Sequence, residues 1–109
     1  MLDDLAFSLH ETAVSKGFWP AYDEVDINFV LAKLALVHSE VSEVLEAVRK
    51  QKGSQQVVEE MSDIIIRLLD LYEGMKLSGW IEEGYSLDTE IAGKAAVNAL
   101  RPKMHGNLA

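Results

Sequence analysis

Residues 33–50 read KLALVHSEVSEVLEAVRK, and residues 57–74 read VVEEMSDIIIRLLDLYEG. In both stretches apolar side chains recur every three or four residues, which is the spacing of one face of an α-helix. The turn between them, at residues 51–54, is short and predicts two antiparallel neighbouring helices. The apolar stripe of the first helix consists of Leu31, Leu34, Val41, Leu45 and Val48, and that of the second of Met61, Ile65, Leu68 and Tyr72.

The flanking sequence predicts two further helices and no strand, because no segment alternates apolar and polar residues over many positions. We therefore expect an all-α, four-helix-bundle-like fold in a single domain covering residues 1–109, with residues 101–109 as a mobile tail. The expected helices are Leu2 to about Lys16 with Gly17 at its end, Asp26 or Asn28 to about Lys50, Ser54 as N-cap to about Leu77, and Asp88 as N-cap through Leu100.

Composition excludes several classes of function. The chain has 109 residues, with 18 acidic against 10 basic residues, a net charge of -8 and no cysteine. Disulfides, thiolate zinc sites and thiol nucleophiles are therefore excluded, and binding to a nucleic acid polymer is disfavoured because it needs clustered Lys and Arg. The first residues lack the basic region of a signal peptide, and no apolar run reaches the roughly 18 residues of a membrane span. We expect a cytoplasmic protein that binds no membrane.

Each of the two long helices carries a pair of acids three residues apart, which places both members of a pair on one face. The pairs are Glu40 with Glu43 and Glu60 with Asp63, and apolar residues flank both. Four carboxylates meeting in a half-buried groove would repel one another unless a cation joins them. Because all the ligands are hard oxygens, they favour Mg²⁺, with Mn²⁺ as a substitute, over zinc.

Other interpretations of these acids stay open. Acid pairs are common on solvated helix faces, so either pair alone is weak evidence of a site. Two pairs on adjacent long helices, each beside apolar residues, leave a metal site and a solvated surface evenly matched. A ferritin-like di-iron centre is disfavoured, because it needs Glu-x-x-His where this chain has Glu43 and Asp63. Arg67 is expected to pair with Asp63 or Asp70 on its own helix, and no Gly-rich phosphate loop is present.

With these motifs the chain resembles the MazG-like branch of the all-α nucleoside triphosphate pyrophosphohydrolases. The motif of that family, Glu-Glu-x-x-Glu followed by Glu-x-x-Asp, occurs here as Ser39-Glu40-Val41-Ser42-Glu43 and Glu60-Met61-Ser62-Asp63, with Ser39 as a departure from the family pattern. Gly17-Phe18-Trp19 and the C-terminal pattern Lys94, Asn98, Arg101, Pro102, His105 and Gly106 also resemble the family, so the similarity spans residues 17–106.

The resemblance implies hydrolysis of a (deoxy)nucleoside triphosphate to monophosphate and pyrophosphate, as house-cleaning of the nucleotide pool. It implies Mg²⁺ held by Glu40, Glu43, Glu60 and Asp63, with Glu40 and above all Glu43 as catalytic residues. The expected substrate-binding residues are Trp19, Lys33, Lys94, Asn98, Arg101, Lys103 and His105. Trp19 either stacks on the base or packs the connection onto the helices, and Lys33 is otherwise a surface lysine.

Two further expectations complete the analysis. A short chain with several apolar stripes is expected to hide part of that surface in a homodimer or homotetramer, as the family resemblance also implies. The alternative function is a non-catalytic dimerisation or nucleotide-sensing module that keeps the fold without turnover, and Ser39 is the feature that favours it.

Overall fold

The chain folds into helices, as a computed structural model shows for residues 1–103, the part of the chain that the structure describes. The element order is α1 (Leu2–Ser15), the 3₁₀ turn η1 (Tyr22–Glu24), α2 (Ile27–Arg49), α3 (Ser54–Leu77) and α4 (Leu87–Ala99). Residues 1–103 contain no strand, so the all-α prediction is confirmed. None of the described helices is long and apolar enough to cross a membrane.

Local signals explain where α2 and α3 begin. Asp26 caps α2, because its Oδ1 accepts a hydrogen bond of 2.9 Å from the backbone N–H of Phe29. The N-cap of α3 is Gly53, at a φ of 94° that favours glycine, and Ser54 is the first helical residue. The prediction that Ser54 caps α3 is therefore wrong by one position, because the chain needs the left-handed conformation there.

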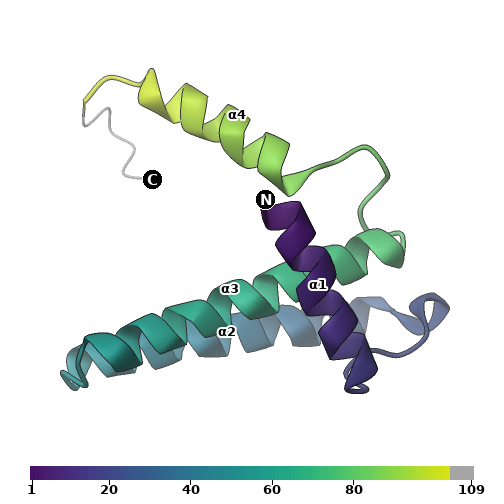
Figure 1. The fold of residues 1–109 in the computed structure, drawn as a ribbon, viewed down its shortest axis with the longest axis horizontal. Coiled ribbons are helices and arrows are strands. Elements are labelled where there is room, and N and C mark those ends of the chain that lie inside the picture. The colour runs from purple at the N-terminus through teal and green to yellow at the C-terminus, as the bar shows by residue number, and fades with distance from the viewer. Residues whose placement is uncertain (104–109) are drawn as a thin grey trace.

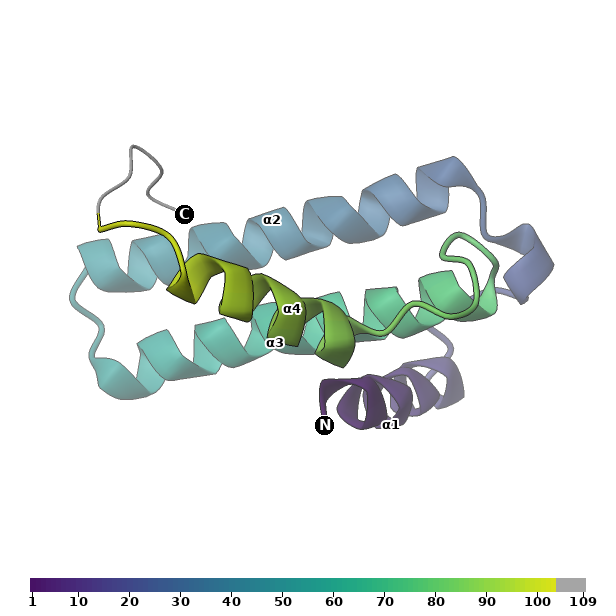
Figure 2. The same cartoon turned by 90° about the horizontal axis from the view of Figure 1, so that it is seen from above.

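The two long helices lie side by side as an antiparallel hairpin, and α1 crosses α3 near the C-terminal end of that helix (Figures 1 and 2). The apolar core sits at this crossing and consists of Trp19, Val25, Val30 and Leu71. The Trp19 indole lies directly on Gly74, where a Cβ atom would come within 2.0 Å of the ring. Because Gly74 has no side chain, the connection after α1 can pack closely against α3.

A buried polar group joins α1, η1 and α3 within the same region. The His10 ring is 2% exposed, its Nδ1 lies 2.8 Å from Asp70 Oδ1, and its Nε2 lies 2.8 Å from the Tyr22 hydroxyl. Asp70 also accepts a hydrogen bond of 2.9 Å from Trp19 Nε1. Because an ionised carboxylate only accepts hydrogen bonds, Nδ1 of His10 donates to Asp70.

The rest of the hairpin has little apolar cover. Large apolar side chains along both helices are more than half exposed, among them Leu31, Leu45, Val48, Val58, Met61 and Ile65. These residues include most of the two stripes that the sequence pattern identifies. The apolar stripes of the hairpin are therefore largely uncovered within the described chain.

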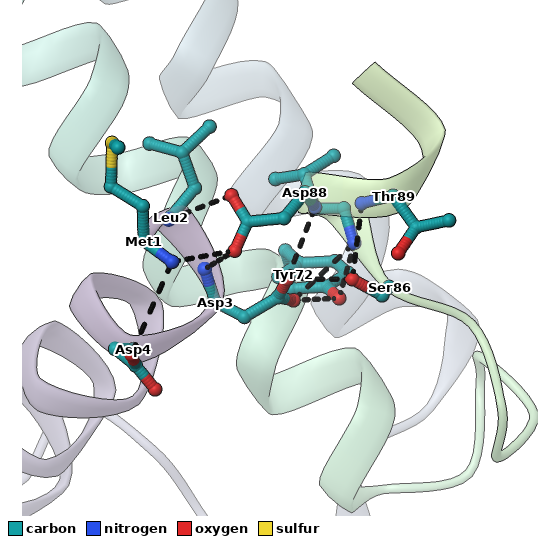
Figure 3. Close-up of polar contacts among 9 residues, drawn as sticks. Met1, Leu2, Asp3, Asp4, Tyr72, Ser86, Asp88 and Thr89 are labelled. Atoms are coloured by element: carbon teal, nitrogen blue, oxygen red, sulfur yellow. Dashed lines mark hydrogen bonds and ion pairs between the residues drawn. The ribbon is translucent and has the colours of Figure 1, made fainter. Parts of the chain in front are cut away.

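The start of α1 is capped by a side chain from α4. Asp88 lies in the first turn of α4, and its carboxylate accepts hydrogen bonds from the backbone N–H groups of Leu2 at 2.8 Å and Asp3 at 3.0 Å (Figure 3). These N–H groups have no partner within their own helix, so a carboxylate there stabilises the helix terminus. The N-cap of α4 itself is Ser86, which corrects the expectation that Asp88 has this role.

The start of α4 is capped in return by Asp3. Its carboxylate accepts hydrogen bonds from the Tyr72 hydroxyl, from the backbone N–H of Asp88 at 3.0 Å and from the Ser86 hydroxyl at 2.8 Å. The Tyr72 hydrogen bond, followed by those from Asp88 and Ser86, holds the pKa of Asp3 below the usual range of a carboxyl group against the opposing effect of burial. We call Asp3, Tyr72, Ser86 and Asp88 the clasp. It fixes the first turn of α4 to the crossing of α1 and α3.

Beyond the clasp, α4 stands off from the hairpin (Figure 1). Every residue from 89 to 103 is exposed. The described chain is therefore a three-helix unit of α1, α2 and α3 with α4 attached at one end, rather than a closed bundle of four helices.

Candidate metal centre

Three of the four acids that the sequence singles out meet between α2 and α3. Glu40 on α2 and Glu60 and Asp63 on α3 each offer a carboxylate oxygen, and these oxygens all lie within 4.8 Å of one another. The antiparallel pairing of the two helices brings them together, since Glu60 and Asp63 are one turn apart on one face. Glu40 and Glu60 are half-buried and Asp63 is exposed, so the group sits at the rim of the helix interface.

Two of these carboxylates accept hydrogen bonds from neighbouring side chains. Arg67 Nε donates a hydrogen bond of 2.8 Å to Glu40 Oε1, which makes an ion pair across the two helices. Gln56 Nε2 donates to Glu60 Oε1 at 2.6 Å. The expectation that Arg67 pairs with Asp63 or Asp70 is thus wrong, because Asp70 already accepts from His10 and Trp19 and Glu40 faces Arg67 from the other helix.

The chemistry of this group fits a hard divalent cation. Two oxygens bound to one Mg²⁺ at about 2.1 Å lie roughly 3 to 4 Å apart, so closing the group onto an ion needs shifts of about 1 Å. One divalent cation together with the Arg67 guanidinium would match the charge of the three carboxylates. The absence of histidine and cysteine from the group favours Mg²⁺ or Mn²⁺ over zinc.

Glu43, the fourth predicted ligand, lies one turn after Glu40 on α2. Its side chain is exposed, and it is not part of the group formed by Glu40, Glu60 and Asp63. The structure therefore places it beside the centre rather than in it. From this position it remains the candidate for a base acting on a water molecule next to the carboxylates.

A cavity of about 530 Å³ opens between α1, α2 and α3, and Asp63 and Arg67 line one part of it. Lys33 lines it as well, with its Nζ 5.3 Å from the ring centroids of both Trp19 and Phe29. These two aromatic rings hold the lysine by cation–π attraction. The volume is in the range of small-molecule sites, and the cavity wall carries Lys33 and Arg67 together with Asp63 from the acidic group.

Two polar or aromatic residues of this cavity carry no signal in the sequence pattern that would assign them to a site. Lys16 and Phe18 line it from the end of α1 and the connection that follows. In the sequence Lys16 marks the end of a helix and Phe18 belongs to a motif, whereas in the structure Phe18 is 63% exposed. Their location near a helix end that crosses the hairpin depends on the packing of α1, which no local pattern reveals.

The sequence leaves two roles open for Trp19, stacking on a base or packing the connection onto the helices, and in the structure Trp19 packs. It is 8% exposed, its ring lies on Gly74, and its Nε1 is bonded to Asp70. The exposed aromatic ring next to the cavity belongs to Phe18.

The remaining predicted substrate residues lie on α4 or after it. Lys94, Asn98 and Arg101 share one face of the α4 segment, where they line a shallow groove of about 330 Å³, and Lys103 is exposed beyond them. The structure does not bring them to the carboxylates of the same chain. His105 and the rest of the expected tail from residue 104 on lie outside the described residues.

Comparison of the chain with protein-family models, with curated proteins and with solved structures finds no match.

Proposed function

We propose that this protein is a Mg²⁺-dependent nucleoside triphosphate pyrophosphohydrolase of the MazG-like type. One observation carries the proposal: carboxylates from two antiparallel helices lie within 4.8 Å of one another, and Asp63 also lines a cavity with Lys33. Anionic ligands and a protein of net charge -8 repel each other unless a cation bridges them. A triphosphate meets that requirement, since it carries both the charge and the oxygens that Mg²⁺ prefers.

In this proposal Glu40, Glu60 and Asp63 hold the ion. A bound Mg²⁺ supplies Lewis acidity and neutralises the phosphates. Lys33 contacts a phosphate oxygen from the cavity wall, and Glu43 accepts a proton from the attacking water. One water molecule is consumed, the bond between the α- and β-phosphates breaks, and the products are the monophosphate and pyrophosphate.

The proposal includes self-association in the cytoplasm as a homodimer or homotetramer. Its support is the apolar surface of the hairpin, where side chains such as Leu45 and Val58 are 54% and 59% exposed. Burying this face against the same face of a second copy gives a closed two-fold arrangement.

The Arg67–Glu40 ion pair favours one alternative function. Arg67 already supplies a positive charge to Glu40, and Ser39 removes one acid of the family motif. A chain that keeps the helices but binds its nucleotide without turnover, as a sensing or dimerisation module, would tolerate both features.

The test is pyrophosphate release from a panel of NTPs and dNTPs, in Mg²⁺ and in chelator. We expect release in Mg²⁺ from the wild type and loss of release in Glu43→Gln. Glu46→Gln is the matched control, because Glu46 lies on the same helix but pairs with Arg49 and Lys50 at the surface. Nucleotide binding without any pyrophosphate release would favour the sensing module, and release that persists in chelator would contradict the metal-dependent mechanism.

A further inference from the structure

A second cavity, of about 410 Å³, opens where α1 crosses α3 (Figure 1). Its volume is also within the roughly 300 to 1,000 Å³ of small-molecule sites. Among the described residues it shares no lining side chain with the cavity of Asp63 and Lys33. At about 100° per residue, the positions of α1 that line the two cavities fall on opposite faces of that helix. The main side chains of the second cavity are Phe7, Glu11, Val14, Tyr22, Glu73 and Leu77.

Much of the wall of this cavity is apolar. Phe7 and Val14 line it from α1 and Leu77 lines it from α3, and these side chains are 44%, 42% and 51% exposed. A ligand with an apolar body would remove part of this surface from water, and that burial favours binding. Two of the lining residues, Phe7 and Tyr22, are aromatic, and an aromatic ring attracts a cation that lies over its face.

The charged side chains of the cavity are acidic. Among the described residues that line it, Glu11 and Glu73 are acids and none is Lys or Arg. Glu11 is exposed, whereas the Glu73 side chain is only 13% exposed. Within residues 1–103 Glu73 pairs with Lys76, whose Nζ lies 3.8 Å from Oε1, and this distance is longer than a hydrogen bond. The charge of a half-buried carboxylate is therefore only partly compensated by the chain itself.

The Tyr22 hydroxyl lies in this negative environment. Burial first, and then the charges of Glu73 and Asp70, raise the pKa of the hydroxyl above its usual value, so the group stays neutral at pH 7. Its oxygen lies 2.8 Å from Nε2 of His10, and the other side of the His10 ring is held by Asp70 at 2.8 Å. The cavity wall is thus fixed at this point, and a ligand that contacts it has little to order on binding.

We propose that this cavity binds a small primary amine with an apolar body. Its ammonium group donates a charge-assisted hydrogen bond to the Glu73 carboxylate and a second hydrogen bond to the Tyr22 hydroxyl oxygen. Its apolar body packs on Phe7, Val14 and Leu77. An anionic ligand would instead meet an acid that the chain only partly compensates. The proposal rests on this cavity alone and is independent of the proposed function.

The probe is phenethylamine, and its neutral counterpart phenethyl alcohol has nearly the same size without the charge. Each is titrated at pH 7 and about 0.15 M salt into ¹⁵N-labelled wild-type protein, and the backbone amide resonances are followed by NMR. We expect saturable shifts at Phe7, Glu11 and Leu77 with a Kd of about 1 mM or lower for the amine. The alcohol should bind at least tenfold more weakly, and the amide of Lys33 in the other cavity should not shift.

Variants locate the two parts of the bound amine. Glu73→Gln removes the charge and keeps the shape of the side chain, so it should weaken amine binding about tenfold or more and leave alcohol binding nearly unchanged. Glu59→Gln is the matched control, because it makes the same change in net charge about 20 Å away on the same helix, and it should leave the Kd unchanged. Val14→Trp keeps both carboxylates and fills the cavity, so it should abolish binding of either probe.

Each other result overturns the proposal. The absence of saturable shifts at tens of millimolar amine would show that the cavity binds no amine. Equal weakening by Glu73→Gln and Glu59→Gln would mean that only the overall negative charge attracts the probe. Equal binding of the alcohol and the amine would mean an apolar cavity without selectivity for a cation. If circular dichroism shows that Glu73→Gln is unfolded, Val14→Trp and the comparison of the two probes on the wild type decide.

Discussion

Replacing His10 by alanine is expected to destabilise the fold far more than replacing a histidine usually does. The ring is 2% exposed and makes hydrogen bonds of 2.8 Å to Asp70 and to Tyr22, with the Trp19 ring edge-on at 4.7 Å between centroids. Removing it leaves a cavity at the crossing of α1 and α3 and takes one donor from the Asp70 carboxylate. Large-to-small changes in a core cost about 2 to 5 kcal/mol. Asp70 keeps its hydrogen bond from Trp19 Nε1, so the loss of the donor from His10 adds about 1 kcal/mol.

We therefore expect His10→Ala to lower the free energy of unfolding by about 4 kcal/mol, a large part of the roughly 5 to 15 kcal/mol of a typical domain. Urea denaturation followed by circular dichroism measures this as a midpoint lower by about 2 M. His38→Ala is the matched control, because His38 is exposed on α2 and should change stability by less than about 0.5 kcal/mol. Equal midpoints for the two variants would refute the polar core that joins α1, η1 and α3.

Two further variants test the packing and the clasp. Gly74→Ala should lower the free energy of unfolding by about 3 kcal/mol or more, because its Cβ would lie 2.0 Å from the Trp19 ring. Urea denaturation measures this as a lower midpoint. Gly93→Ala, where nothing lies within 4 Å, should instead stabilise α4 by up to about 1 kcal/mol; equal effects of the two would contradict the model of Trp19 packing. Asp3 has a lowered pKa in the folded chain, so its contribution to stability is complete above about pH 4 and is lost as the pH falls through the folded pKa. Asp3→Asn should flatten the acid side of a stability–pH curve, whereas Asp23→Asn at an exposed site should leave its slope nearly unchanged.

Elements that depend on local chemistry are predictable from the sequence here. The helix over Ile27–Arg49 follows from its apolar period and from Asp26, a residue whose carboxylate caps the helix within four residues of sequence. The meeting of Glu40 with Glu60 and Asp63 also follows from the sequence, since a short turn between two long helices sets their pairing.

Contacts between distant segments are not predictable in this way. Asp88 is an acidic residue in the first turn of α4 and could cap its own helix, yet its carboxylate accepts hydrogen bonds from the backbone N–H groups of Leu2 and Asp3. Arg67 has acids one turn away on both sides, but it pairs with Glu40 on the other helix. In both cases several partners of equal chemistry lie within reach, and only the packing of whole helices decides between them.

Divalent-cation binding by the carboxylates of α2 and α3 is measured most directly by titrating the protein with Mn²⁺ and following free Mn²⁺ by electron paramagnetic resonance. We expect stoichiometric binding to the wild type, competition by Mg²⁺, and at least a tenfold weaker affinity in Glu60→Gln, equivalent to about 1.4 kcal/mol. Glu59→Gln is the matched control, because Glu59 is the exposed neighbour and accepts a hydrogen bond from Gln55 at 3.0 Å. Loss of affinity that is the same in both variants, or no binding to the wild type at millimolar Mn²⁺, would contradict a metal centre formed by Glu40, Glu60 and Asp63.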